Sequence, residues 1–142
     1  MREGARQKNK MTALDKFLFG EMLWEASEVA RNYCLNPRNL GVLGDADAQA
    51  VITGPCGDTM EIYLKISDDT IQHAEFMTDG CGYTIACGSV ATEMLIGSKV
   101  DDAFKIDQKK IEERLGGLPK DYRHCALLTA NTIQKALTDF SQ

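Results

Sequence analysis

Three of the five cysteines in this chain lie beside glycines or beside a second side chain that can bind a metal. The three segments are Gly54-Pro55-Cys56-Gly57-Asp58, Gly80-Cys81-Gly82 and His124-Cys125. Thiolate and imidazole groups bind zinc, copper and iron well, and thiolates are also the ligands of iron–sulfur clusters. Because the segments are far apart in the sequence, only a folded domain can bring them together. The sequence therefore predicts a metal or cluster site built from Cys56, Asp58, Cys81, His124 and Cys125.

The position of each of these cysteines favours a reactive thiol. Cys56 lies in a glycine-containing turn, where the backbone can approach a bulky ligand and donate N–H groups to cluster sulfur. Cys81 precedes one helical pattern, and Cys125 opens another. The partial positive charge of a helix N-terminus favours a thiolate over a thiol. We therefore expect all three thiols to be exposed, activated and able to converge.

The two other cysteines are predicted to be structural. Cys87 falls on an apolar helical stripe, where a free cysteine usually acts as a small buried hydrophobic group. Cys34 lies at the end of a predicted helix with no polar neighbour, and a role in sulfur relay is the alternative. His73, in the middle of a predicted strand, is expected to be an ordinary surface or edge residue. The sequence has no Cys-x-x-Cys pair, which argues against a zinc ribbon or a thioredoxin-type redox site.

The elements that must position this site begin with a helix and a small sheet. Apolar residues recur at three- and four-residue intervals over 12–34, which predicts a helix that ends before Asn36-Pro37. Three strands are predicted, over residues 49–53, 59–66 and 70–78. The second strand alternates apolar and polar side chains, as a half-buried strand does. Ser67-Asp68-Asp69 is typical of a turn, so the last two strands should form a hairpin.

Helices are predicted from Cys81 to the C-terminus. One follows Cys81 and ends at Gly97, and the polar stretch 99–114 should form one or two short helices. The last helix begins near Cys125. Five of its residues share one apolar face, namely Ala126, Ala130, Ile133, Leu137 and Phe140. The predicted fold class is therefore α+β, a small three-stranded antiparallel sheet with helices packed on one face.

Length and composition are those of a single globular domain. The chain has 142 residues, of which 44% are hydrophobic and 26% are charged. A net charge of -5 argues against nucleic acid as a partner, and no apolar run approaches the roughly 18 residues of a membrane span. Residues 1–10 lack the apolar core of a secretory signal, so we expect a flexible lead-in over 1–15 and one domain over 16–142. The odd number of cysteines favours reduced thiols and a cytoplasmic location.

Several of these segments together resemble the IscU/NifU-type iron–sulfur cluster assembly scaffold family. The similarity runs from about Ala26 to the C-terminus, in order and with nearly the family's spacings. The similar segments are Asn36-Pro37-Arg38-Asn39, Gly54-Pro55-Cys56-Gly57-Asp58, Thr78-Asp79-Gly80-Cys81-Gly82, Ile85-Ala86, Thr92-Glu93 and Leu118-Pro119 through His124-Cys125. Independent motifs in register make this resemblance far more specific than any single motif.

The resemblance implies a carrier rather than an ordinary enzyme. Members of the family receive sulfur as persulfide from a cysteine desulfurase, receive iron from a donor, build a transient 2Fe–2S cluster and pass it to apo-proteins. By resemblance, Cys56, Cys81 and Cys125 are the thiolate ligands, and Cys125 is the persulfide acceptor. Asp58 and His124 compete for the fourth position, and the same ligands hold zinc when no cluster is present. A carboxylate or imidazole there is easier to replace than a fourth thiolate, which suits a site that releases its cluster.

The resemblance comes with one departure, one feature that favours the scaffold over the sulfur-shuttle branch, and two alternatives. The segment 118–122 differs from the Leu-Pro-Pro-Val-Lys stretch that binds a specialised Hsp70 chaperone in the family, so that partner is not carried over. The interval from Cys81 to Cys125 has no room for the long insertion of the zinc-dependent SufU-type branch. The first alternative is a zinc-bound sulfur acceptor that activates a desulfurase without building a cluster. The second, a cysteine hydrolase or transferase using Cys125 with His124, is disfavoured because adjacent residues at a helix start rarely point the same way.

Overall fold

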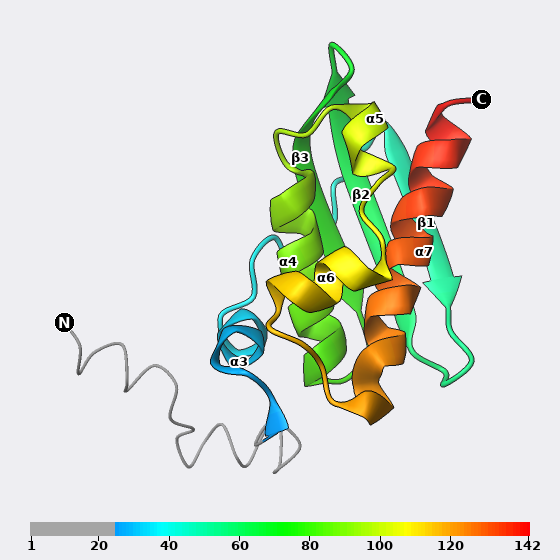
Figure 1. The fold of residues 1–142 in the computed structure, drawn as a ribbon. Coiled ribbons are helices and arrows are strands. Elements are labelled where there is room, and N and C mark those ends of the chain that lie inside the picture. The colour runs from blue at the N-terminus through cyan, green and yellow to red at the C-terminus, as the bar shows by residue number, and fades with distance from the viewer. Residues whose placement is uncertain (1–24) are drawn as a thin grey trace, which may run out of the picture.

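The computed structural model describes residues 25–142, which run from one helix into a three-stranded sheet and then into further helices (Figure 1). The elements are α3 (Glu28–Leu35), β1 (Ala48–Thr53), β2 (Thr59–Ser67), β3 (Thr70–Thr78), α4 (Gly82–Leu95), α5 (Val100–Ala103), α6 (Gln108–Arg114), the 3-10 turn η2 (Lys120–Tyr122) and α7 (Arg123–Phe140). The predicted order of helix, strands and helices is confirmed. The polar stretch 99–114 contains two short helices, as expected.

The sheet is a meander in which β2 lies between β1 and β3 and pairs antiparallel with both. Met60, Ile62 and Leu64 of β2 are fully buried, whereas the residues between them are partly exposed. This alternation confirms the period of two read from the sequence. At the β2–β3 turn both Asp68 and Asp69 have a left-handed backbone, with φ of 53° and 59°. Such a pair is typical of a tight two-residue hairpin turn, so the predicted hairpin is confirmed.

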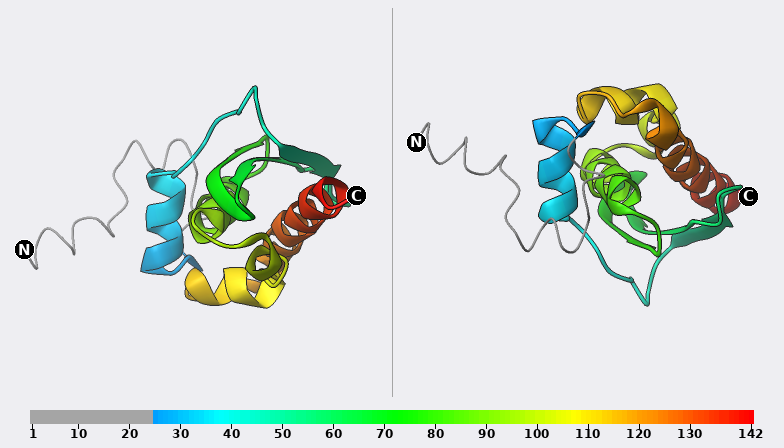
Figure 2. Two further views of the ribbon diagram at one scale, coloured as in Figure 1. Left: turned by 90° about the horizontal axis from the view of Figure 1, so that it is seen from above. Right: turned by 90° about the horizontal axis from the view of Figure 1, so that it is seen from below.

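Helices α4 and α7 cover the same face of the sheet, and this confirms the predicted α+β arrangement. In the views of Figures 1 and 2, α6 lies across α4 and α7 on the side away from the sheet, and α3 packs beside α4. A β-carbon on Gly88 of α4 would lie 2.3 Å from the ring of Phe76 on β3. The absence of that carbon lets α4 approach β3 closely.

The predicted helix over 12–34 is wrong over residues 25–27. Ser27 is the N-cap of α3, where its side-chain oxygen accepts a hydrogen bond from the Ala30 N–H at 2.9 Å. Its hydroxyl also donates to the backbone oxygen of Leu115, a partner that the local pattern does not reveal. A serine used in this way begins a helix rather than continuing one. The end at Asn36 is confirmed, whereas the predicted start at residue 12 and the domain boundary at residue 15 lie outside the described residues.

One expectation about α7 is confirmed and another is wrong. The helix begins at Arg123, near Cys125 as predicted. Phe140 was expected on the buried face but is 40% exposed, because it lies in the last turn, beyond the buried run that closes with Leu137. Between residues 25 and 142, no helix is long and apolar enough to cross a membrane.

Candidate metal and cluster site

Three segments of the chain meet at one end of the sheet. The β1–β2 turn and the end of β3 lie at the same end, because Thr53 pairs with Thr59 and Met60 pairs with Thr78. Helices α4 and α7 also begin at this end (Figure 1). Antiparallel pairing and the packing of two helices therefore bring together the cysteine segments that are distant in sequence.

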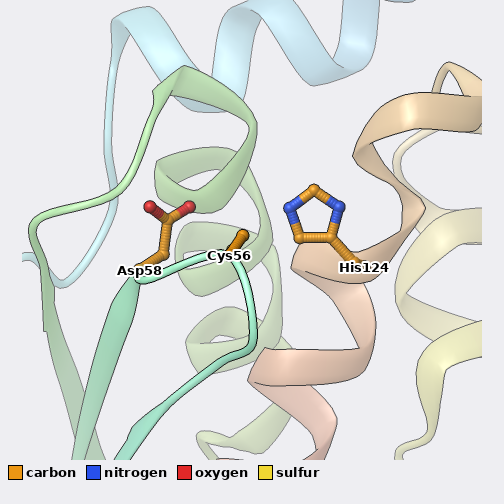
Figure 3. A group of neighbouring side chains, drawn as sticks. All are labelled: Cys56, Asp58 and His124. Atoms are coloured by element: carbon orange, nitrogen blue, oxygen red, sulfur yellow. The ribbon is translucent and has the colours of Figure 1, made fainter.

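The structure brings all five predicted ligands into two overlapping triads. The outer triad is Cys56, Asp58 and His124, and the inner triad is Asp58, Cys81 and Cys125. Within each triad one ligand atom from each residue lies within 4.8 Å of the others. Zinc bonds of about 2.0–2.3 Å place tetrahedral ligand atoms roughly 3.3–3.8 Å apart, so a small contraction suffices. In Figure 3, Cys56 and Asp58 on the β1–β2 turn and His124 at the start of α7 border the same space.

The β1–β2 turn holds Cys56 and Asp58 by backbone hydrogen bonds. The N–H of Gly54 donates to the backbone oxygen of Asp58 at 2.8 Å, and the N–H of Gly57 donates to the backbone oxygen of Gly54 at 2.9 Å. Gly57 has a φ of +95°, which a side chain would strain. The N–H of Thr59 donates to Asp79 at 2.8 Å and so ties this turn to the segment that carries Cys81.

The five predicted ligands differ in their exposure to solvent. Cys56 and His124 are exposed, Asp58 and Cys81 are partly buried, and Cys125 is 0% exposed. The expectation that all three thiols are exposed is therefore wrong for Cys125. Its side chain lies on the inner face of α7, which packs against the sheet and α4. The position of Cys125 near the start of a helix did not indicate whether its side chain would lie on the inner or the outer face of that helix.

One hydrogen bond is the largest cause of the pKa shifts of the two cysteines in the inner triad. The Cys125 thiol donates to the Cys81 sulfur, and this lowers the pKa of Cys81 to about 5, although burial acts in the other direction. The Thr84 hydroxyl and the N–H groups at the start of α4 lower the pKa of Cys81 further. The same shared proton, together with burial, raises the pKa of Cys125. The direction of the pKa shift is therefore the one expected of an activated thiol for Cys81 and the opposite for Cys125.

A stacked pair of aromatic rings joins the starts of the two helices. Tyr83, next to Cys81 in α4, stacks on Tyr122 with ring centroids 4.2 Å apart and an interplanar angle of 27°. Burial raises the pKa of Tyr83 to about 12, and the nearby Tyr122 adds to that shift. Because Tyr122 immediately precedes α7, the stack helps to hold Cys81 and Cys125 in register.

Sequence reasoning missed Thr84, which also lies at the site. Its hydroxyl is 3.3 Å from Asp58 Oδ2 and 3.3 Å from Cys125 Sγ, and Cys81 Sγ lies 3.7 Å away. The available signal was its place three residues after Cys81, in the first helical turn. Within an apolar helix, however, a threonine has the same pattern as a core residue.

The cysteines and histidine outside the site lie as predicted. Cys34 is 2% exposed and Cys87 is 0% exposed, so both belong to the core. Burial raises the pKa of Cys87, which keeps this thiol protonated. His73 lies on β3 with its side chain exposed, and it is remote from both triads.

The chain is similar to known proteins over this whole region. Residues 25–142 match the family described as NifU-like N terminal domain. The iron-sulfur cluster assembly scaffold protein IscU 1 of Archaeoglobus fulgidus is 43% identical over 106 residues, which cover 74% of this chain and 69% of that protein. The IscU scaffold protein of Aquifex aeolicus is 39% identical over 122 residues, which cover 84% and 78% of the two chains.

A solved structure supports the fold. The N-terminal part of a NifU-like protein from Brucella abortus superposes with a TM-score of 0.65 at 20% identity, over 85% of this chain and 96% of that one. At this identity the likeness concerns the fold, and the membership rests on the sequence matches. This chain belongs to the family of NifU-like N-terminal domains.

Proposed function

We propose that this chain is a scaffold on which an iron–sulfur cluster is assembled and from which the cluster passes to apo-proteins. The observation that carries this proposal is the pair of triads, three thiols with one shared carboxylate and one imidazole at one end of the sheet. Relatives named as IscU scaffold proteins support the proposal. In this role the chain is a carrier rather than an ordinary enzyme, and the 2Fe–2S cluster is its cargo.

The ligand chemistry suits temporary holding. Thiolates are the usual ligands of iron–sulfur clusters, and four of them hold a cluster permanently in ferredoxins. Here Cys56, Cys81 and Cys125 are the proposed thiolate ligands, and Asp58 or His124 completes the set. Replacing one thiolate by an oxygen or nitrogen ligand leaves a position that an acceptor protein's thiolate can take over.

Sulfur delivery follows from thiol chemistry. The partners of this proposal are a cysteine desulfurase and an iron donor. The thiolate of Cys125 attacks the outer sulfur of the desulfurase persulfide, a new S–S bond forms, and the desulfurase cysteine leaves as a thiolate. Because Cys125 is buried and its pKa is raised, the start of α7 must move outward and the thiol must lose its proton to solvent before this attack. Release of the sulfur as sulfide then needs two electrons from a reductant such as a dithiol.

Anaerobic reconstitution tests the scaffold function. The protein, purified without oxygen, is incubated with ferrous iron, cysteine, a cysteine desulfurase and a dithiol reductant. We expect visible charge-transfer absorption and about two irons per chain, as a 2Fe–2S centre requires. Changing Cys56, Cys81 or Cys125 to serine should abolish the colour, whereas Cys87→Ala should keep it. Protein that stays colourless and retains zinc would contradict the scaffold function.

A second candidate is favoured by the outer triad. Cys56, Asp58 and His124 offer one sulfur, one oxygen and one nitrogen ligand, a mixed set that zinc accepts readily. A zinc-bound sulfur acceptor that activates a desulfurase is therefore the alternative, and persistent zinc without colour would support it. In both cases the thiols must stay reduced, and the cytoplasmic location expected from the cysteine count stays a prediction.

A further inference from the structure

The hydroxyl of Thr84 lies among the proposed ligand atoms rather than behind them. It donates at 3.3 Å to Asp58 Oδ2 or to Cys125 Sγ, and Cys81 Sγ is 3.7 Å away. Thr84 is 0% exposed, so water does not compete for this hydroxyl. A single polar group therefore contacts every member of the inner triad.

Other buried threonines of this fold use their hydroxyls differently. Thr92, Thr129 and Thr132 each donate to the backbone oxygen four residues earlier in their own helix. Thr84 lies in the first turn of α4, and the hydrogen-bond partners that the structure gives its hydroxyl are side chains of the inner triad. The hydroxyl of Thr84 therefore hydrogen-bonds to side chains of the site, whereas the other three hydroxyls hydrogen-bond to the backbone of their own helix.

The backbone of Gly80 makes room for this arrangement. A β-carbon at Gly80 would lie 2.6 Å from Thr84 Oγ1, closer than such atoms approach, and 3.0 Å from Asp58 Oδ2, which is an unusually tight contact. The Gly80 N–H donates to the Thr78 hydroxyl at 3.0 Å, which holds the segment in place. A residue without a side chain thus borders the contact between the hydroxyl and the carboxylate.

We propose that Thr84 is a positioning residue whose hydroxyl gathers Asp58, Cys81 and Cys125 before metal arrives and then donates to a ligand atom in the loaded site. The inference deepens the proposed scaffold function and rests on it. A hydroxyl carries one proton to donate, which stabilises whichever neighbouring carboxylate or sulfur bears more negative charge. Groups that hydrogen-bond to metal ligands fix their orientation, and hydrogen bonds to sulfur also set cluster potentials.

Zinc serves as the first probe, because it tests the ligands without cluster assembly. Thr84→Val keeps the shape of the side chain but removes the hydroxyl, and Thr84→Ser restores it. The zinc dissociation constant of each variant is measured by competition with a chromophoric chelator. We expect Thr84→Val to bind zinc about 10–100-fold more weakly, the usual effect of losing a hydrogen bond to a ligand, and Thr84→Ser to recover most of that loss. Thr132→Val, which removes a buried hydroxyl remote from the ligands, is the matched control and should bind as wild type does.

The midpoint potential of the reconstituted cluster is the second readout. Donation to a ligand sulfur stabilises the reduced cluster, so Thr84→Val should lower the potential and Thr84→Ser should restore it. A purely structural role would lower the unfolding temperature of Thr84→Val and Thr132→Val alike but leave the potential unchanged. Wild-type zinc affinity in Thr84→Val would overturn the inference. If wild type forms no cluster, the scaffold function fails, and the zinc measurement still decides the role of Thr84.

Discussion

At the scale of single residues, a hydrogen bond between the thiols of Cys81 and Cys125 shifts their pKa values in opposite directions. The hydrogen bond to Cys81, together with burial, raises the pKa of Cys125, whereas the same hydrogen bond and the N–H groups at the start of α4 lower the pKa of Cys81. We therefore expect Cys81 to be the more acidic of the two thiols. This difference between two neighbouring thiols is accessible to alkylation chemistry.

In the metal-free protein, we expect the rate of Cys81 alkylation by iodoacetamide to follow the lowered pKa. The thiolate is the reactive form, so the rate should be flat above about pH 6 and fall as the pH drops through about 5. Cys125→Ala removes the donor and should raise the pKa of Cys81, which slows alkylation at pH 6 by more than about tenfold. Mass spectrometry of peptides gives the rate at each cysteine. Cys34→Ala, which removes a buried cysteine outside the triads, is the control, and an equal slowing there would contradict this account.

Asp58 is predicted to govern release. Asp58→Ala removes the exchangeable oxygen ligand, so the remaining ligands must give way before an acceptor can take the cluster. We expect transfer to apo-ferredoxin to slow by about tenfold, the lower range of effects from changes around a metal ligand. The transfer is followed by the ferredoxin spectrum. The control is Asp101→Ala, at an exposed position on α5, which should transfer its cluster at the wild-type rate. A wild-type transfer rate in Asp58→Ala would contradict a role for Asp58 in release.

At the scale of elements, the site depends on how closely two helices approach the sheet. The alternation of apolar and polar residues was enough to predict the second strand, because its apolar residues Met60, Ile62 and Leu64 are the buried ones. The start of α3 was not predictable, since Ser27 is fixed by Leu115, which is far away in the chain. Burial of Cys125 and the role of Thr84 were missed for the same reason. Cys125 is buried because α7 packs against the sheet and α4, and Thr84 reaches the site through its contacts with Asp58 and Cys125. No local pattern in the sequence contains these contacts.

Gly88 should tolerate no larger side chain. Gly88→Ala places a carbon 2.3 Å from the Phe76 ring, so α4 or the ring must shift. Overpacking of this kind costs about 1–3 kcal/mol, which urea unfolding measures directly. Gly44→Ala is the matched control, because its added carbon would meet nothing within 4 Å. We expect Gly88→Ala also to weaken zinc binding, since it displaces the helix that carries Cys81, and equal stability of the two variants would contradict this packing.

At the scale of the whole molecule, the site joins segments that the unfolded chain keeps apart. The five proposed ligands come from the β1–β2 turn, the start of α4 and the start of α7, so a metal that binds them would hold the sheet and both helices together. The resemblance to the IscU/NifU family predicts these ligands from motifs alone. Their division into an inner and an outer triad required the fold.

Zinc should therefore stabilise the folded state. At a free concentration of about one hundred times the dissociation constant, the free energy of unfolding should rise by about 2.7 kcal/mol. Urea unfolding with and without zinc measures the gain, and a chelator should reverse it. Cys81→Ser should lose most of the gain. Cys87→Ala should be less stable from the start but keep the same increment, and loss of the increment there would place Cys87 at the site.

The carboxylate that belongs to both triads has a consequence for stoichiometry. A carboxylate has two oxygens, so Asp58 can give one to an ion held with Cys56 and His124 and the other to an ion held with Cys81 and Cys125. Two ions bound in this way would be neighbours joined through one side chain. We therefore expect this end of the molecule to hold a joined pair of ions per chain, the number that a 2Fe–2S cluster contains.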